Sequence, residues 1–409
     1  MASIRYWAWL SSVTAASPQG RYALAAHYGD AEQAFLAPAG DFAHVPGLSA
    51  RDAALFEKRE LRDADRILEA CLRERINMVA LSDAAYPRRL RNICAPPVVL
   101  YVKGTLPDVD AVPSVAVLGT RSATPYGLRM ARKIAFEIAR CGGTVISGLT
   151  EGIDRMAAEG CLLGGGRCIG VLGTAHGKDG PLREDIALSG ALVSEYPPGT
   201  RPQNYFFRER NRVAAGLSHA VCVVEAPAMS GSLLFAREAL EQGREIFAVP
   251  GNADAANSAG IVTLLKQGAR PAACGWDVLE ELAAVYPGTL HPPGEVVELP
   301  ERGTPAPEKP AKTRPSSAKS DKESRPSAKK EIDKQSGDSY IDLTELCASL
   351  SEEQKSIVTV LGRGDADIDD IIEATGLGTA KVLSQLTLLE IRGVICRAGG
   401  RRVGLKTKK

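Results

Sequence analysis

The sequence has few aromatic residues and almost no net charge, and both deficits limit what the protein binds. Aromatic residues make up 5% of the 409 positions, too few for a broad surface on which successive bases stack. The 50 Lys and Arg residues are balanced by 49 Asp and Glu residues, which leaves a formal charge of +1. A nucleic-acid site would therefore need a local cluster of basic groups.

Metal-ligand patterns and long apolar runs are also missing. The nine cysteines contain no C-x-x-C pair and the five histidines no ligand spacing, so we expect reduced thiols without a disulfide framework or a zinc site. No run approaches the ~20 apolar residues of a membrane span. Ser11 and Ser12 interrupt the segment Arg5–Leu10, which imitates a secretion signal. We expect a soluble, cytoplasmic protein that does not contact membranes.

Composition divides the chain into four regions. The first is a predicted helical domain and the third a predicted linker. Residues 1–80 are expected to form a small helical domain, with helices at 7–14, 21–28, 31–35 and 50–74. The turn Val45–Ser49 is typical either of a simple connector or of a helix-hairpin-helix or SAM-like module whose amides meet phosphate. Residues 286–340 are rich in Pro, Ser, Lys and Glu, and we predict a disordered linker because they cannot bury enough apolar surface to fold.

The second region, residues 81–285, begins with a lead-in at 81–111 and then alternates short apolar runs with helical patterns. Strands are predicted at 115–118, 144–147, 168–172, 191–194, 220–224 and 246–249, and helices at 126–141, 153–163, 183–188, 212–217 and 233–242. Strands that are apolar on both faces indicate a parallel sheet with helical crossovers. The predicted fold class is α/β, with a Rossmann-like, doubly wound, mainly parallel sheet.

The fourth region, residues 341–409, regains helical periodicity. The capping pattern Ser351–Gln354 opens a helix, and further helices are predicted at 368–374 and 379–390, before a hairpin near 393–400. Three helices and a hairpin indicate a winged helix with a basic tail.

The edge of the α/β sheet is the expected ligand site, since ligands of doubly wound sheets bind beyond the carboxyl ends of the strands. Glycine and hydroxyl residues follow the predicted strands at 119–122, 147–154, 230–232 and 250–252. Backbone amides of such turns and the N-termini of helices attract phosphate. The pattern therefore indicates several phosphate groups along one edge, more than one mononucleotide would need.

Basic groups follow two of the predicted strands, those at 115–118 and 191–194. Arg121 lies at the first strand end, and the run Phe206–Arg212 opens a helix with guanidinium and aromatic groups that suit phosphate and an unpaired base. Alternatively, Arg210 and Arg212 form ion pairs that fix the loop. We interpret Asp154 as a helix-start cap rather than a catalytic residue.

Motifs of common enzymes are not fulfilled. Gly173–Lys178 imitates a P-loop but has one residue too few between its glycines, and Asp179 follows where Ser or Thr would hold magnesium. The G-x-S-x-G elbow of serine hydrolases is missing.

Taken in order, the motifs resemble those of the DNA-processing protein A family (DprA, also called Smf). The resemblance extends from Trp7 to about Asp277, and the C-terminal winged helix agrees with it. The matching runs are Pro96–Gly104, Gly119–Arg121, Ser147–Asp154, Val193–Gly199, Arg210–Ser218, Val224–Ala226, Ser230–Ser232, Ala239–Arg244 and Val249–Gly251.

The resemblance implies a non-enzymatic mediator of natural transformation (competence) and recombination. Such a protein binds incoming single-stranded DNA, protects it and loads RecA recombinase onto it, as a homodimer and without a metal or nucleotide cofactor. Carried over residue by residue, and with Ser122 and Arg208 added from the motifs above, the predicted DNA-binding residues are Arg121, Ser122, Gly148, Gly152, Phe207, Arg208, Arg210, Asn211, Arg212, Gly231 and Ser232.

The chain departs from the family pattern at three places. Glu209 stands where the family has a basic residue, the loop at 175–185 differs, and Gly260–Val262 replaces a more polar turn.

Two other functions fit the sequence less well. A related phosphoribohydrolase would need a glutamate where Gly231–Phe235 offers apolar side chains. A duplex-reading regulator would need a basic recognition helix, but Lys381 is the one basic residue between 379 and 390.

Overall fold

The computed structural model describes residues 4–177 and 180–294, and in the C-terminal region residues 352–361, 366–377, 382, 385, 386, 389, 395–399 and 402–405. The chain divides into two compact units, Met1–Pro307 and Glu308–Lys409. Each unit is described by itself.

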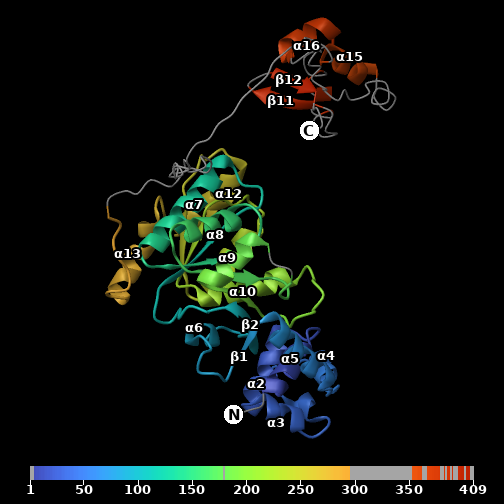
Figure 1. Ribbon diagram of the computed structural model, residues 1–409, viewed down its shortest axis with the longest axis vertical. Coiled ribbons are helices and arrows are strands. Elements are labelled where there is room, and N and C mark those ends of the chain that lie inside the picture. Colours follow the sequence, from blue (N-terminus) through green and yellow to red (C-terminus); the bar gives the residue numbers. More distant parts are fainter. Residues whose placement is uncertain are drawn as a thin grey trace, which may run out of the picture. The chain divides into compact units, whose positions relative to one another are not determined.

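The N-terminal part of the first unit is helical, as predicted (Figure 1). Trp9, Phe42 and Phe56 form its core, so the apolar segment Arg5–Leu10 belongs to a packed helix. The helices are α1 (Ile4–Ser12), α2 (Pro18–Tyr28), α3 (Ala31–Leu36), the 3₁₀ helix η1 (Asp41–His44), α4 (Ala50–Phe56) and α5 (Arg62–Glu74).

The single long helix expected at 50–74 is wrong, because the chain breaks between α4 and α5. Arg59, in the break, donates hydrogen bonds to the backbone carbonyls of Phe35, Ala37 and Pro38 and lies over the ring of Phe42. Its guanidinium thus satisfies carbonyl groups at the end of α3, which a continuous helix would leave without this partner.

A nine-stranded sheet forms the centre of the first unit, in the order β1-β2-β6-β5-β4-β3-β7-β8-β9. The seven strands β6-β5-β4-β3-β7-β8-β9 run parallel to one another. At one edge, β2 pairs antiparallel with β6, and β1 pairs antiparallel with β2. The predicted lead-in therefore contributes strand β2 to the sheet. The strands are β1 (Asn77–Ala80), β2 (Val99–Gly104), β3 (Ser114–Leu118), β4 (Thr144–Ser147), β5 (Cys168–Leu172), β6 (Ala191–Ser194), β7 (Ala220–Val223), β8 (Glu245–Ala248) and β9 (Arg270–Pro271).

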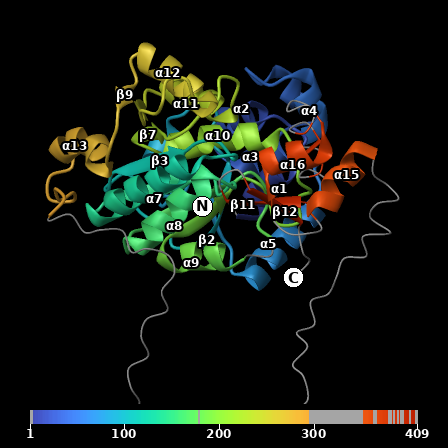
Figure 2. The same cartoon turned by 90° about the horizontal axis from the view of Figure 1, so that it is seen from above.

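Helices cover both faces of the sheet, as Figure 2 shows for α7 to α9 on one side and α10 to α12 on the other. Along β3, Val115 and Val117 face one core while Ala116 and Leu118 face the other. Because successive side chains of a strand alternate between faces, each central strand joins two cores. The helices are α6 (Arg88–Arg91), α7 (Pro125–Arg140), α8 (Ile153–Leu163), α9 (Pro181–Ser189), α10 (Phe206–Leu217), α11 (Gly231–Glu241), the 3₁₀ helix η2 (Ala256–Ser258), α12 (Ala259–Lys266) and α13 (Gly275–Val285).

The doubly wound α/β fold is confirmed, and all six predicted strands occur within one residue of their expected bounds. Helix α10 begins six residues earlier than predicted, at Phe206 rather than Arg212.

In the second unit, α15 (Glu352–Leu361), α16 (Ile368–Thr375) and the antiparallel pair β11 (Ile395–Gly399) and β12 (Arg402–Leu405) match the predicted winged helix. The short strand β10 (Ala366–Asp367) pairs with β12. Ile357, Leu361 and Ile371 lie in the core of the second unit. Most of the predicted helix at 379–390, the basic tail and the predicted linker beyond residue 294 lie outside the described residues.

Candidate nucleic-acid interface

The carboxyl ends of β3, β4 and β7 meet where the strand order reverses. Strand β3 pairs with β4 on one side and β7 on the other. The loops that follow are joined by backbone hydrogen bonds from Thr120 N to Glu225 O (2.8 Å) and from Ile153 N to Thr120 O (3.3 Å). We call the edge formed by residues 119–122, 148–152, 173–177, 225–232 and the start of α10 the strand-end rim.

Two glycines let the rim loops approach each other closely. A Cβ at Gly119 would lie 2.6 Å from the Ile153 side chain and 2.8 Å from the carbonyl of Glu225. Gly152 has a φ of +84° and faces the carbonyls of Thr120 and Arg121, where a Cβ would lie at 2.5 Å. Any larger residue at either position would separate the loops.

Two buried carboxylates hold the rim together from below. Asp154 accepts hydrogen bonds from Gly119 N (3.3 Å) and Thr150 Oγ1 (3.0 Å), and burial raises its pKa. It is the second residue of α8, and Gly152 occupies the N-cap, so the expected helix-start cap is wrong in detail. Its carboxylate ties the loops after β3 and β4 together.

Glu225 has the same role between β3 and β7. Its carboxylate accepts hydrogen bonds from Thr124 N (2.9 Å), from the Thr124 hydroxyl and from Asn257 Nδ2 (3.2 Å). Because these donors engage both oxygens, Glu225 serves as a structural anchor.

Four of the predicted site residues present exposed side chains on the rim. Arg121 and Ser122 lie in the loop after β3, and Phe207 and Arg208 lie in the first turn of α10. Phe207 is 43% exposed, and its ring covers Gly173 after β5, where a Cβ would lie 2.7 Å from the ring. Among the described residues, neither Arg121 nor Arg208 has a carboxylate partner.

Arg210 is buried beneath the rim rather than exposed on it. The residue is 7% exposed, and its Nη1 donates to the carbonyl of Val171 at 2.9 Å. The guanidinium fills the space beside Gly148, where a Cβ would lie 2.0 Å from Nη1. Arg210 therefore supports the loop after β4 from inside, although burial lowers its pKa and Asp154 counteracts this shift.

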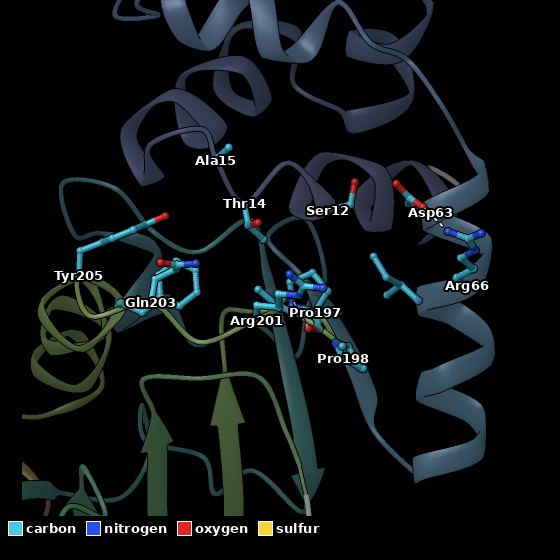
Figure 3. A pocket seen from close by; sticks show the side chains of 14 residues that line it. Ser12, Thr14, Ala15, Asp63, Arg66, Pro197, Pro198, Arg201, Gln203 and Tyr205 are labelled. Atoms are coloured by element: carbon cyan, nitrogen blue, oxygen red, sulfur yellow. Dashed lines mark hydrogen bonds and ion pairs between the residues drawn. The ribbon is translucent and has the colours of Figure 1, made fainter.

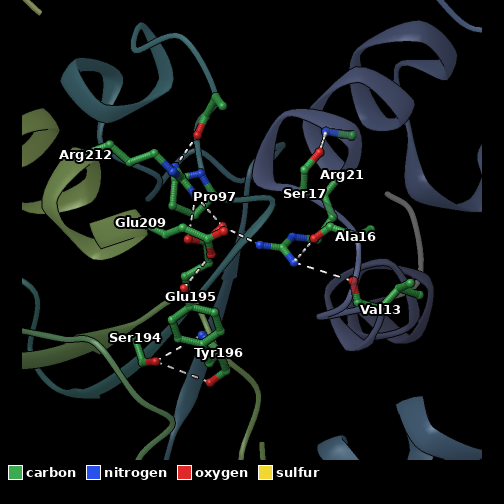
Figure 4. A network of polar contacts seen from close by, with 12 residues as sticks. Val13, Ala16, Ser17, Arg21, Pro97, Ser194, Glu195, Tyr196, Glu209 and Arg212 are labelled. Carbon is green, nitrogen blue, oxygen red and sulfur yellow. Dashed lines mark hydrogen bonds and ion pairs between the residues drawn. The ribbon is translucent and has the colours of Figure 1, made fainter. Parts of the chain in front are cut away.

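Arg212 belongs to a buried ionic cluster with Arg21 and Glu195, shown in Figure 4. Both Arg212 and Arg21 pair with the Glu195 carboxylate, Arg21 at 3.1 Å, and Arg212 also donates to the carbonyl of Ala95. The three side chains are 9%, 3% and 5% exposed in the order Arg212, Arg21, Glu195. For Arg212, the structure therefore agrees with the alternative stated in the sequence analysis, an ion pair that fixes the loop, and not with a phosphate contact.

Glu209, the unexpected acid of the motif, is turned away from the exposed residues. Its carboxylate accepts a hydrogen bond from the Tyr196 hydroxyl at 2.8 Å, and burial raises its pKa. Arg208 is therefore the exposed charge of this turn.

The remaining predicted residues differ in exposure. Asn211 is half-buried and Ser232 is buried, whereas Gly231 is exposed at the start of α11, with nothing within 4 Å of the position of a Cβ. Ile261, one of the departures from the family pattern, lies in the core.

Sequence reasoning missed Thr124 and Asn257, which hold Glu225 in place. Thr124 is the N-cap of α7 and accepts from Gly127 N, and Pro125 follows it. A threonine before proline at a helix start is a recognisable cap signal. For Asn257, in the 3₁₀ helix η2 far along the chain, the sequence offers no comparable signal.

Within the described residues, no group of His, Cys, Asp and Glu side chains is arranged to hold a metal ion. The described cysteines Cys71, Cys94, Cys141, Cys161, Cys168, Cys222 and Cys274 are unpaired. Of the helices in the described ranges, none has the length and apolarity needed to cross a bilayer.

Comparison with known proteins assigns the chain to a family. The family model of DNA recombination-mediator protein A matches residues 77–283, and that of the DprA winged helix domain matches residues 344–401. DNA processing protein DprA of Bacillus subtilis is 38% identical over 222 residues, which cover 53% of this chain and 75% of that protein. Protein Smf of Synechocystis is 35% identical over 289 residues, 68% of this chain and 73% of that protein.

A solved structure agrees with these sequence matches. The crystal structure of DNA processing protein A from Streptococcus pneumoniae aligns with a TM-score of 0.59 and 31% identity, over 69% of this chain and 99% of that one. The chain is a member of the DprA/Smf family of DNA-processing recombination mediators.

Proposed function

We propose that this protein binds single-stranded DNA along the strand-end rim, protects it, and loads RecA onto it during natural transformation and homologous recombination. It acts in the cytoplasm as a homodimer, and as a binding protein rather than an enzyme. The observation that supports the binding role most strongly is the grouping of exposed Arg121, Phe207 and Arg208 on one edge of the sheet.

The chemistry of the rim favours binding over bond cleavage. Guanidinium groups bind phosphate oxygens, and an exposed ring stacks on an unpaired base, which a duplex does not offer. The carboxylates beneath the rim, Asp154 and Glu225, are engaged by loop donors, and the first turn of α11 contains no acid for attack on a glycosidic bond.

The first experiment compares Arg121→Ala and Arg208→Ala with the unaltered protein. Fluorescence anisotropy with single- and double-stranded oligonucleotides of equal sequence measures affinity over a range of salt concentrations. We expect each variant to lose about tenfold in affinity for every single-stranded sequence, because a hydrogen bond from a charged group to a phosphate is worth ~1.4 kcal/mol and does not depend on the base. The salt slope should fall by roughly 0.7 for each phosphate that the variant no longer neutralises.

Arg140→Ala is the matched control for charge. Arg140 is exposed at the C-terminal end of α7, which returns from the carboxyl edge of β3 to the amino edge of β4. The substitution removes the same charge at the opposite edge of the sheet and should leave affinity unchanged. Equal losses in all three variants, or a preference for duplex DNA, would contradict the proposal.

A separate assay addresses RecA. The rate at which RecA covers single-stranded DNA is measured with and without this protein, on DNA coated with a single-strand-binding protein. We expect acceleration with the unaltered protein and with Arg140→Ala, and a much smaller effect with Arg121→Ala. No acceleration by the unaltered protein would reject the loading role while leaving the DNA-binding role intact.

A further inference from the structure

A cavity of about 460 Å³ lies beside the rim, between the N-terminal helices and the loop after β6 (Figure 3). Its walls come from α1 with the turn after it, from α5, and from residues 197–206. None of the residues that line the cavity is among the predicted DNA-binding residues. Its position after β6 continues the row of loops at the carboxyl edge of the sheet.

The side chains around the cavity combine a ring, a cation and small polar groups. Figure 3 shows Tyr205 at one end, the Asp63–Arg66 pair at the other, and Arg201 between them. Asp63 and Arg66 compensate each other at 3.1 Å, whereas Arg201 is exposed and has no carboxylate partner among the described residues. The cavity therefore has one uncompensated positive charge.

The aromatic residues at the start of α10 divide the cavity from the rim. Phe206 is 2% exposed and stacks on Tyr196 with ring centroids 3.8 Å apart, which fixes the turn. Tyr205 and Phe207, its two neighbours, are 47% and 43% exposed. Tyr205 lines the cavity, and Phe207 covers Gly173 on the rim. Two exposed rings thus stand on either side of one rigid turn.

From this arrangement we infer that the cavity is a second nucleotide subsite, occupied by a nucleotide of the same single strand after it leaves the rim. The strand passes over the first turn of α10, its base stacks on Tyr205, and its phosphate meets Arg201. Ser12 and Gln203 also line the cavity. The Ser12 hydroxyl donates to the carbonyl of Trp9 at 2.7 Å and so offers a base edge an acceptor, and the amide of Gln203 offers a donor and an acceptor. The inference depends on the proposed single-strand binding at the rim.

The test is a length series of fluorescein-labelled oligothymidylates, from about 4 to about 16 nucleotides, the range of single-strand site sizes. Affinities are measured for the full-length protein and for Tyr205→Ala, Tyr205→Phe, Arg201→Ala and Arg140→Ala. Short oligonucleotides that occupy the rim alone should bind all five proteins equally. Beyond a threshold length, Tyr205→Ala should lose roughly fivefold to 150-fold, the effect of removing one base stack, and Tyr205→Phe should retain affinity.

For Arg201→Ala, the salt slope should fall by roughly 0.7, again only beyond the threshold length. Thermal melting of each variant confirms that it is folded, and cross-linking of 5-iodouracil at successive positions identifies the nucleotide that reaches Tyr205. Equal affinities at every length, or equal losses at every length, would overturn the subsite. Binding of free thymidine monophosphate that Tyr205→Ala abolishes, without an effect on long oligonucleotides, would also overturn it in favour of a small-molecule site.

The Arg121→Ala variant separates this inference from the proposed function. If Arg121→Ala weakens all lengths while Tyr205→Ala weakens none, the rim binds DNA and the cavity does not. If neither variant affects any length, the proposed function fails as well.

Discussion

The buried Glu195 carboxylate gives the sharpest prediction, because this one side chain pairs with two arginines from different parts of the first unit. Arg21 comes from α2 and Arg212 from α10, and both pair with Glu195 in the interior. Glu195→Gln keeps the shape of the side chain but removes its charge. Two buried guanidinium groups would then lose the carboxylate with which both of them pair.

The expected loss of stability is large. Removal of one partner from a buried ion pair costs about 3–5 kcal/mol, since the remaining charge is left without solvent or a counter-ion. The glutamine amide would also turn an N–H₂ group toward the guanidinium donors. We therefore expect Glu195→Gln to lower the free energy of unfolding by about 3–5 kcal/mol. The exposed pair Arg237–Glu241, at 2.9 Å with side chains 78% and 58% exposed, provides the control. Glu241→Gln should change stability by less than about 0.5 kcal/mol.

Urea denaturation measured by tryptophan fluorescence is a suitable assay. The chain has three tryptophans, Trp7, Trp9 and Trp276, and all of them lie in the first unit. The signal therefore reports the unfolding of this unit. A loss for Glu195→Gln within about 1 kcal/mol of the Glu241→Gln value would refute the reasoning, because the cluster would then contribute no more than a surface pair.

Two further predictions concern a buried histidine and a rim glycine. Burial lowers the pKa of His219 to about 3, and its Nδ1 accepts from Ser114 N at 3.1 Å, so the folded protein keeps it neutral while the unfolded chain protonates near pH 6.5. Because the unfolded state then binds more protons, stability should fall as pH decreases from 6.5 towards 3, by about 2 kcal/mol at pH 5, and His219→Gln should reduce this fall in urea titrations at each pH. Gly148→Ala should cost about 1–3 kcal/mol in thermal melting and weaken DNA binding in anisotropy measurements, because its Cβ displaces Arg210. Gly177→Ala, where a Cβ has open space around it, is the control for stability and should leave melting unchanged.

The sequence predicts the strands of the α/β sheet well because their burial is local information. Strands β4, β5 and β6 are buried throughout and mainly apolar, and each ends at, or just before, a glycine or a polar residue, so their bounds follow from composition. Helix α10 is harder, since its first turn contains Arg208 and Glu209 and its burial depends on Tyr196 from another loop. The break between α4 and α5 likewise depends on distant carbonyls that Arg59 binds.

The candidate site is predicted in part for a similar reason. Residue types identify Arg121 and Phe207 as binding groups, and both are exposed on the rim. The same residue types in Arg210 and Arg212 give no sign that the two guanidinium groups are buried. Their burial depends on a carbonyl at Val171 and a carboxylate at Glu195, which the chain brings together only in three dimensions.

The two arginines of the Arg210–Arg212 motif have different structural roles. Arg210 supports the loop after β4, and Arg212 joins α10 to the N-terminal helices through Glu195 and Arg21. The same helix start presents Phe207 to the rim and Tyr205 to the cavity. Side chains held in place before a ligand arrives lose less entropy on binding. The buried arginines would then contribute to affinity without touching DNA, because they fix the turn on which the exposed rings and Arg208 stand.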